Sequence, residues 1–183
     1  KDCGFNIGII EATNAGYGVT GYTTAKITIQ HDLFYDNLIN NFSLAEAKQY
    51  LKANEEGIQL IRNIIKENKI QCDYKEQTAY VYAASMDEVD DLQKELKAYE
   101  KLGIDGFYTE TVPLPNKVYG AIGVRNQGQF NPLKYLYSLY NILINSNVKI
   151  YENVRALDIN PHDDHVDVET EKGTIHAHKV IVA

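Results

Sequence analysis

The sequence predicts an α/β lobe that is interrupted by an inserted α+β lobe. Short β-branched strand candidates stand at both ends of the chain, and a helix leads back to the second group of them. The middle holds two capped amphipathic helices among strands of antiparallel character. Because the two ends resemble each other and differ from the middle, we expect both ends to form one domain around an insertion.

Composition and charge narrow the class of protein. The 183 residues suffice for one core or two small lobes, and the formal charge of −7 argues against a nucleic-acid partner. No apolar run reaches the length of a membrane span. Cys3 and Cys72 stand far apart, which fits free thiols in a reducing compartment. We therefore expect a cytoplasmic protein with no nucleic-acid and no membrane partner.

The first elements are a strand and a loop. Residues 5–12 read as a short buried strand, and residues 14–24 read as a loop with closely spaced glycines. The strand ends on Glu11. An acid in this position is the usual acceptor for a ribose 2′-OH in a dinucleotide-binding unit, which opens about 20 residues earlier with G-x-G-x-x-G. Only ten residues precede Glu11, and they contain no such loop.

The middle of the chain begins with two helices that carry capping boxes. Ser43 and Glu46 start a helix that runs to about Glu67, and Ser85 and Glu88 start another that Gly103 ends. Strands are expected at residues 78–83, 107–112 and 118–124. The acids at positions 87, 88, 90 and 91 fit a solvated helix start better than a metal site.

The last part of the chain returns to strands. Pro132 at the first helical position, behind Asn131, predicts a third helix. A strand over residues 148–159 is expected to turn or bulge near Asn153, and a hairpin over residues 165–183 turns at "EKG". His176 and His178 alternate on one strand, but no cysteine or acid is expected in register with them. We therefore predict no metal site.

Five segments together resemble a known family: "GIIEA", "GYGVTGYTTAKIT", "QFNPLKYLYSLYNIL", "VKIYENVRALDI" and "GTIHAHKVIVA". They are similar to FAD-dependent oxidoreductases of the D-amino acid oxidase and glycine oxidase type. The resemblance is strongest to bacterial members with "TTAK", some of which carry a C-terminal Rieske domain. It implies a partial FAD-binding Rossmann-like domain (residues 1–42 and 128–183) and an antiparallel-sheet substrate domain (residues 43–127).

The resemblance also implies that this chain is an internal fragment. The first strand and glycine loop would lie before Lys1, and the segment that closes over the flavin would follow Ala183. Such a fragment is expected to bind FAD weakly or not at all, to be inactive alone, and to self-associate through an exposed sheet edge.

The family's cofactor contacts are carried over residue by residue. Glu11 would hold the adenosine ribose, Lys26 would approach the isoalloxazine, Ala156 would contact the adenine and Ala183 would open the last cofactor turn. The residues implied along the pyrophosphate and toward the flavin are Gly18, Thr20, Gly21, Thr23 and Thr24. Tyr22 stands where relatives usually have Arg, so no charge role is expected there.

Substrate residues are left open. The family takes them from the inserted sheet, where Tyr80, Tyr82, Tyr108, Tyr119 and Arg125 lie on strand candidates, and none is assigned as catalytic. A further candidate is His31, which would serve either in acid–base work or as a satisfied polar neighbour, beside Gln30.

The function implied is oxidation of an amine or amino-acid-like small molecule by hydride transfer to flavin. Two alternatives stay open: a non-catalytic interaction module with a complete small α/β fold, and an enzyme that uses a nicotinamide cofactor. The incomplete flavoprotein domain would be distinguished from the module by whether "NIGIIEA" lies beside "HKVIVA" in a parallel sheet with one central position empty.

Overall fold

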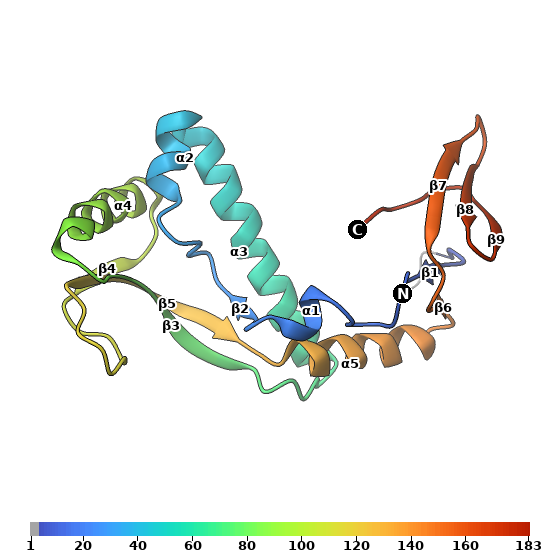
Figure 1. The fold of residues 1–183 in the computed structure, drawn as a ribbon, viewed down its shortest axis with the longest axis horizontal. Helices are drawn as coiled ribbons and strands as arrows, with labels where there is room; N and C mark the ends of the chain where they lie inside the picture. Colours follow the sequence, from blue (N-terminus) through green and yellow to red (C-terminus); the bar gives the residue numbers. More distant parts are fainter. Residues whose placement is uncertain (1–3) are drawn as a thin grey trace. The chain divides into compact units, whose positions relative to one another are not determined.

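The computed structural model describes residues 4–183, which pack as two compact units (Figure 1). The first unit contains residues 4–23 and Pro132–Ala183, and the second is Thr24–Asn131. The predicted fold class is confirmed, because both ends of the chain share one unit and the molecule combines parallel with antiparallel sheets. Cys3 lies outside the described residues.

The first unit holds one parallel strand pair and one antiparallel meander. Its elements are β1 (Gly8–Ile10), α1 (Val19–Tyr22), α5 (Pro132–Ile144), β6 (Lys149–Tyr151), β7 (Ala156–Pro161), β8 (Val166–Thr170) and β9 (Gly173–Ala177). β1 and β6 run parallel, with Ile9 opposite Ile150. β7, β8 and β9 follow one another as antiparallel neighbours. Because β1 and β6 are parallel, their carboxyl ends meet at one edge.

The second unit is an antiparallel sheet with helices. Its elements are β2 (Lys26–Ile27), α2 (Tyr35–Asn41), α3 (Leu44–Glu67), β3 (Lys75–Ala83), the 3₁₀ helix η1 (Met86–Glu88), α4 (Val89–Leu102), β4 (Gly106–Thr109) and β5 (Gly120–Gln129). β5 is central: it pairs with β3, and also with β2 and β4. α4 contacts β3, β4 and β5 and so covers one face of the sheet.

The core of the second unit lies between α4 and that face. Leu92 and Tyr99 on α4 are buried against Ile122 and Val124 on β5, and Tyr35 from α2 joins the same cluster. The ring centroids of Tyr35 and Tyr99 are 5.8 Å apart in an edge-to-face arrangement. This packing fixes which face of the sheet stays uncovered by α4.

Both predicted N-cap serines start their helices, and the reciprocal capping box is complete at Ser85 and Glu88. The Ser43 hydroxyl accepts the Glu46 N–H at 3.2 Å and starts α3, which ends at Glu67. The first turn after Ser85 is 3₁₀ before α4 continues. Gly103 ends α4 in the left-handed region, with φ of 80°. The local signals therefore placed these two helices correctly.

Several predictions about elements were wrong. The segment 14–24 is not all loop, since residues 19–22 form the short helix α1. Helix α2 was missed. The last strand ends at Ala177, and residues 178–183 have no regular secondary structure because they pair with no strand among the described residues. The bend at Asn153 is confirmed: it has φ of 55°, between β6 and β7.

The two packing units divide at 23/24 and 131/132, so residues 24–42 pack with the middle of the chain. The functional boundaries at 42/43 and 127/128 concern cofactor and substrate, and they stay a prediction. Cys72 is buried. Within the described part of the chain, no helix is both long and apolar enough to span a membrane.

Candidate functional site

Glu11 lies directly after β1, where the parallel pair ends. Its backbone N–H donates to the Tyr151 carbonyl at 2.9 Å, and its carbonyl accepts the N–H of Val154 at 2.9 Å. These two bonds continue the β1–β6 ladder by one residue beyond the strands. The position of Glu11 at this edge is therefore set by the backbone of both strands.

The Glu11 carboxylate is half satisfied by its own turn. Oε1 accepts the N–H of Thr13 at 2.8 Å and the Thr13 hydroxyl at 3.0 Å. Among the described residues, Oε2 accepts no hydrogen bond, and the side chain is only half-buried. Glu11 is therefore oriented by Thr13 and keeps one acceptor oxygen for another partner.

A second carboxylate lies at the end of β6. Glu152 Oε1 accepts the N–H of Ala15 at 2.6 Å. The Asn153 N–H donates to the Thr13 carbonyl at 2.8 Å, and the Asn153 amide donates to Asn14 Oδ1 at 3.0 Å. These bonds connect the segment after β1 to the segment after β6 and hold the edge in one conformation.

Tyr140 on α5 lies within the electrostatic reach of both carboxylates. Burial raises the pKa of its phenol, and the charges of Glu152 and Glu11 raise it further. Neither Glu152 nor Tyr140 was predicted from the sequence as a site residue. A signal existed for Glu152, since it is an acid just before the bend expected near Asn153. The sequence carried no such signal for Tyr140, which fits the apolar face of the predicted helix.

The chemistry of this edge favours hydroxyl groups over anions. Ionised carboxylates only accept hydrogen bonds, so they match the two hydroxyls of a ribose. A phosphate placed beside Glu11 and Glu152 would meet two like charges. The residues present thus fit the adenosine ribose of FAD and disfavour a 2′-phosphate, for which a nearby Arg is typical.

The glycine-rich segment lies in the same unit as Glu11. Gly18 precedes α1 with φ of 125° and ψ of −150°, a conformation open almost only to glycine. A Cβ on Gly21 would lie 2.5 Å from the Gly16 carbonyl oxygen. The local backbone therefore accounts for glycine at both positions. Thr20 is exposed on α1, and Thr23 follows the helix as its C-cap.

The other implied cofactor residues are scattered. Ala156 opens β7, two residues after Val154, which is hydrogen bonded to Glu11. Glu11 and the Ala156 segment are thus brought together. Ala183 is exposed in the segment without regular structure. Thr24 and Lys26 belong to the second unit, where the exposed Lys26 pairs with Gln129 between β2 and β5.

The sheet of the second unit separates the five substrate candidates. Tyr108 and Tyr119 pack against the buried core. Tyr80 lies on the other face, opposite Gly123, and so does Phe107 on β4. Tyr82 follows two residues later on the same face and is half exposed. We call the face formed by Tyr80, Tyr82, Phe107 and Arg125 the open face.

Arg125 is held on the open face by an aromatic ring. Its guanidinium lies 4.2 Å from the centroid of Phe107, whose ring meets Tyr80 edge-to-face at 6.1 Å. Its acidic neighbour is Asp105, at 3.8 Å, and both side chains are more than half exposed. Such an exposed pair is weak, so the positive charge stays accessible to a ligand.

His31 and Gln30 are engaged by their neighbours. His31 Nδ1 and the Tyr50 hydroxyl are hydrogen bonded at 2.8 Å. The buried Gln30 donates from Nε2 to the Ile122 carbonyl at 3.2 Å. This arrangement favours the satisfied polar neighbour over acid–base work for His31.

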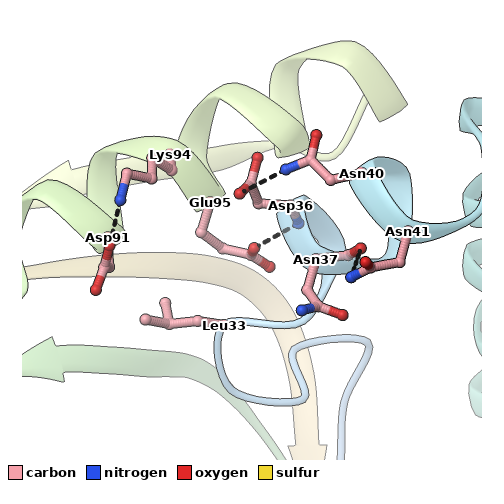
Figure 2. Close-up of a pocket in the computed structure, with 8 residues that line it drawn as sticks. All are labelled: Leu33, Asp36, Asn37, Asn40, Asn41, Asp91, Lys94 and Glu95. Carbon is pink, nitrogen blue, oxygen red and sulfur yellow. Dashed lines mark hydrogen bonds and ion pairs between the residues drawn. The ribbon is translucent and has the colours of Figure 1, made fainter.

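A hollow between α2 and α4 is polar (Figure 2). It is lined by Leu33, Asp36, Asn37, Asn40, Asn41, Asp91, Lys94 and Glu95. Its polar side chains bind one another: Asn40 donates to Asp36 at 3.1 Å, and Lys94 pairs with Asp91 at 2.6 Å. These pairings leave the hollow poorly suited to a cofactor.

Several known proteins are similar to this chain. A family model described as "DAO: FAD dependent oxidoreductase" matches residues 1–183. YhfW of Bacillus subtilis, provisionally named a Rieske 2Fe-2S iron-sulfur protein, is 40% identical over 156 residues, which are 85% of this chain and 31% of YhfW. This name fits the Rieske-bearing relatives expected from the sequence.

Two more distant proteins are similar over nearly the whole chain. Gamma-glutamylputrescine oxidoreductase of Escherichia coli is 23% identical over 188 residues, covering 100% of this chain and 44% of that protein. The crystal structure of glycine oxidase from Geobacillus kaustophilus matches with a TM-score of 0.72 at 18% identity, covering 94% of this chain and 47% of that one. The chain thus spans less than half the length of each of these proteins.

Proposed function

Since this chain belongs to the DAO family of FAD-dependent oxidoreductases, we propose that it is the central part of an enzyme that oxidises the C–N bond of an amine or amino acid by hydride transfer to flavin. Two similar proteins are named for compounds that carry an amine, γ-glutamylputrescine and glycine. FAD, when bound, supplies the hydride acceptor. The activity is proposed for the longer protein, and we expect none from residues 1–183 alone.

The observation that carries the cofactor assignment is the half-satisfied carboxylate of Glu11. Thr13 occupies Oε1, so Oε2 is left to accept a ribose hydroxyl at the carboxyl edge of the parallel pair. Glu152 adds a second negative charge nearby, which selects a neutral diol over a phosphate. The roles of Gly18, Thr20, Gly21, Thr23 and Thr24 along the pyrophosphate, of Lys26 at the flavin, and of Ala156 and Ala183 are proposed from the resemblance.

On the open face, we assign substrate positioning to Arg125. Its accessible guanidinium suits a carboxylate, and Phe107 holds it in place without neutralising it. Tyr80 and Tyr82 would border the same substrate. No residue of the second unit is assigned a proton-transfer role.

The alternatives have less support. Membership of a flavoprotein family argues against both an interaction module and a nicotinamide enzyme. The parallel sheet with an empty central position that would have favoured the flavoprotein over the module is not seen among the described residues, because β1 pairs with β6 and residues 178–183 form no strand. A cytoplasmic location stays part of the proposal, because two cysteines far apart in the sequence are typical of a reducing compartment.

The cofactor assignment is tested with Glu11→Gln in the full-length protein. Glutamine keeps one carbonyl oxygen for Thr13 but replaces Oε2 with a donor, so the turn stays and the ribose acceptor is lost. The expected result is at least a tenfold weaker FAD affinity, about 1.4 kcal/mol. The control Glu67→Gln removes an exposed carboxylate outside this edge and should bind FAD as the wild type does. Equal FAD binding by E11Q and the wild type would contradict the assignment.

The reaction is tested by anaerobic mixing of the holoenzyme with glycine, γ-glutamylputrescine and a set of other amines and amino acids. At least one compound should bleach the visible flavin absorbance. A flavin that stays oxidised with every amine, yet is reduced by a substrate without nitrogen, would overturn the proposed substrate class while leaving the FAD assignment intact.

A further inference from the structure

Three histidines surround one aspartate in the meander of the first unit. His162 and His165 stand in the turn between β7 and β8, Asp167 lies on β8 and His176 lies on β9. The His162 N–H donates to the His165 carbonyl at 2.8 Å and closes the turn. Asp167 is directly opposite His176 in the ladder. The expectation that no acid stands in register with His176 was therefore wrong.

The distances between these side chains suit ligands of one metal ion. His162 Nε2 lies 3.4 Å from Asp167 Oδ2, and His165 Nε2 lies 3.4 Å from Asp167 Oδ1. Both separations exceed the usual N–H···O range of about 2.7–3.2 Å. Two ligands that bind a tetrahedral zinc ion at about 2.0–2.2 Å stand roughly 3.4 Å apart. One ligand atom from each of the three residues lies within 4.8 Å of the others.

Neighbouring groups hold the ligand atoms in the orientation that a metal requires. His165 Nδ1 donates to Asp164 Oδ1 at 2.6 Å, so the lone pair of its neutral ring is on Nε2, which faces Asp167. His176 Nδ1 donates to Asp167 Oδ1 at 2.5 Å and orients the carboxylate from the adjacent strand. Two of the three ligand residues, His165 and Asp167, are thereby oriented before any ion arrives.

The positions of the ligand side chains also fit. Asp167 accepts a hydrogen bond from His176, which leaves its carboxylate oriented toward the two histidines of the turn. The rings of His162 and His165 are stacked at 4.5 Å with an interplanar angle of 17°. This stacking holds the two imidazoles side by side, with each Nε2 3.4 Å from an Asp167 oxygen.

Access is open. The side chains of His162, His165 and Asp167 are 48%, 37% and 22% exposed, so an ion can enter and keep water on its remaining positions. Two imidazoles and one carboxylate suit zinc-class ions better than Mg²⁺ or Ca²⁺, which prefer oxygen ligands.

We propose that His162, His165 and Asp167 bind one divalent cation of the zinc class, with Asp164 and His176 orienting the ligands. The ion would fasten the β7–β8 turn to β8, so its role is structural. This site is separate from the proposed cofactor contacts of Glu11 and uses none of the same residues.

The experiment uses the full-length protein without a histidine tag, stripped with a chelator and titrated with Co²⁺. A bound Co²⁺ ion should give visible bands at wavelengths beyond the flavin absorption. The bands should saturate after one equivalent of Co²⁺ more than any other metal site of the protein takes up. Zn²⁺ should displace these bands, and Mg²⁺ should not. His165→Ala and Asp167→Asn should weaken Co²⁺ binding more than about tenfold, and His176→Ala about 10–100-fold.

His178→Ala is the matched control, because it removes an exposed histidine just after the same strand and outside the cluster. It should bind Co²⁺ as the wild type does. Far-UV circular dichroism and FAD content report whether each variant is folded. Because the His176 side chain is exposed, its replacement should disturb the fold least. Absence of the bands in the folded wild type, or equal weakening by H178A and H176A, would overturn the proposal.

Discussion

Glu95 on α4 caps the N-terminus of α2 by accepting the backbone N–H of Asp36 at 2.8 Å (Figure 2). The same carboxylate accepts the N–H of Tyr35 at 2.9 Å and that of Phe34 at 3.2 Å. Glu95 is fully buried, and Phe34, which precedes the helix, has no side-chain oxygen to cap it. One carboxylate from a distant helix therefore satisfies the donors that a local N-cap residue would normally satisfy.

Replacing Glu95 with glutamine should destabilise the second unit. Glutamine keeps one acceptor oxygen and turns a donor toward the N–H groups of α2, so at least one buried N–H loses its partner. The expected loss in the free energy of unfolding is about 2 kcal/mol. Urea denaturation followed by tyrosine fluorescence measures it, since the chain has 14 tyrosines and no tryptophan. Glu100→Gln, at an exposed position of the same helix, is the control, and an equal midpoint for both variants would contradict the capping role.

The same carboxylate should make stability depend on pH. Burial raises the pKa of Glu95 above its ordinary 4.5, although the three backbone hydrogen bonds act in the opposite direction. The folded state therefore holds this proton more tightly than the unfolded chain does. The contribution of Glu95 is fully present below pH 4.5 and is lost as the pH rises through the raised value. The free energy of unfolding of the wild type relative to E95Q should fall across this window, and parallel pH curves for the two proteins would refute the shift.

These contacts explain which helices the sequence could predict. In α3 and in α4, the two residues that form the cap are close in the sequence. Ser43 with Glu46 and Ser85 with Glu88 could therefore be recognised as local motifs. The cap of α2 comes from Glu95, far along the chain, and no local motif announces it. Tertiary contact supplied what the sequence near Tyr35 lacks, which is why α2 was missed.

The candidate site shows the same limit. Glu11 was identified because an acid at a strand tip is a local pattern. Glu152 and Tyr140 become neighbours of Glu11 only through the parallel pairing of β1 with β6 and the packing of α5. The histidine cluster likewise depends on the register that places Asp167 opposite His176. The register of two hairpin strands depends on the length and type of the turn between them. The sequence indicated a turn at "EKG" but did not determine which residues of the two strands stand opposite each other.

Two helix glycines should respond to alanine with opposite signs. Gly103 has φ of 80°, so Gly103→Ala strains the end of α4 and should lower the free energy of unfolding by about 1 kcal/mol. Gly57 is inside α3, and a Cβ there would meet no atom within 4 Å. Gly57→Ala should therefore raise stability by roughly 0.5–1 kcal/mol, because alanine loses less backbone entropy. Urea midpoints measured side by side check both, and the same sign for the two variants would refute the assignment.

Residues 1–183 expressed alone should self-associate. Among the described residues β1 pairs on one side only, and apolar side chains near it and at the end of the chain are exposed: Phe5 by 73%, Ile181 by 94% and Val182 by 77%. Light scattering after size exclusion should show a mass that grows with concentration. Phe5→Ser combined with Ile181→Ser should reduce this growth, whereas Leu60→Ser, at an exposed position of α3, should not. A constant monomer mass at high concentration would rule the association out.

Arg125→Gln in the full-length enzyme should weaken the binding of an amino-acid substrate more than it slows the reaction. The guanidinium is held over Phe107, and its ion pair with Asp105 is long and exposed. A substrate carboxylate would therefore bind Arg125 more strongly than Asp105 does. A lost hydrogen bond to a charged group corresponds to about 1.5–3 kcal/mol, or roughly 10–100-fold in KM. Because the contact is made before and during the reaction, kcat should change little.

Lys117→Gln is the control: it also removes a cation over an aromatic ring, Tyr119, whose side chain packs against the core. Arg125→Lys should recover part of the affinity, since it restores the charge without the bidentate geometry. An unchanged KM in R125Q, for an amino acid that reduces the flavin, would show that the open face does not bind the substrate's carboxylate.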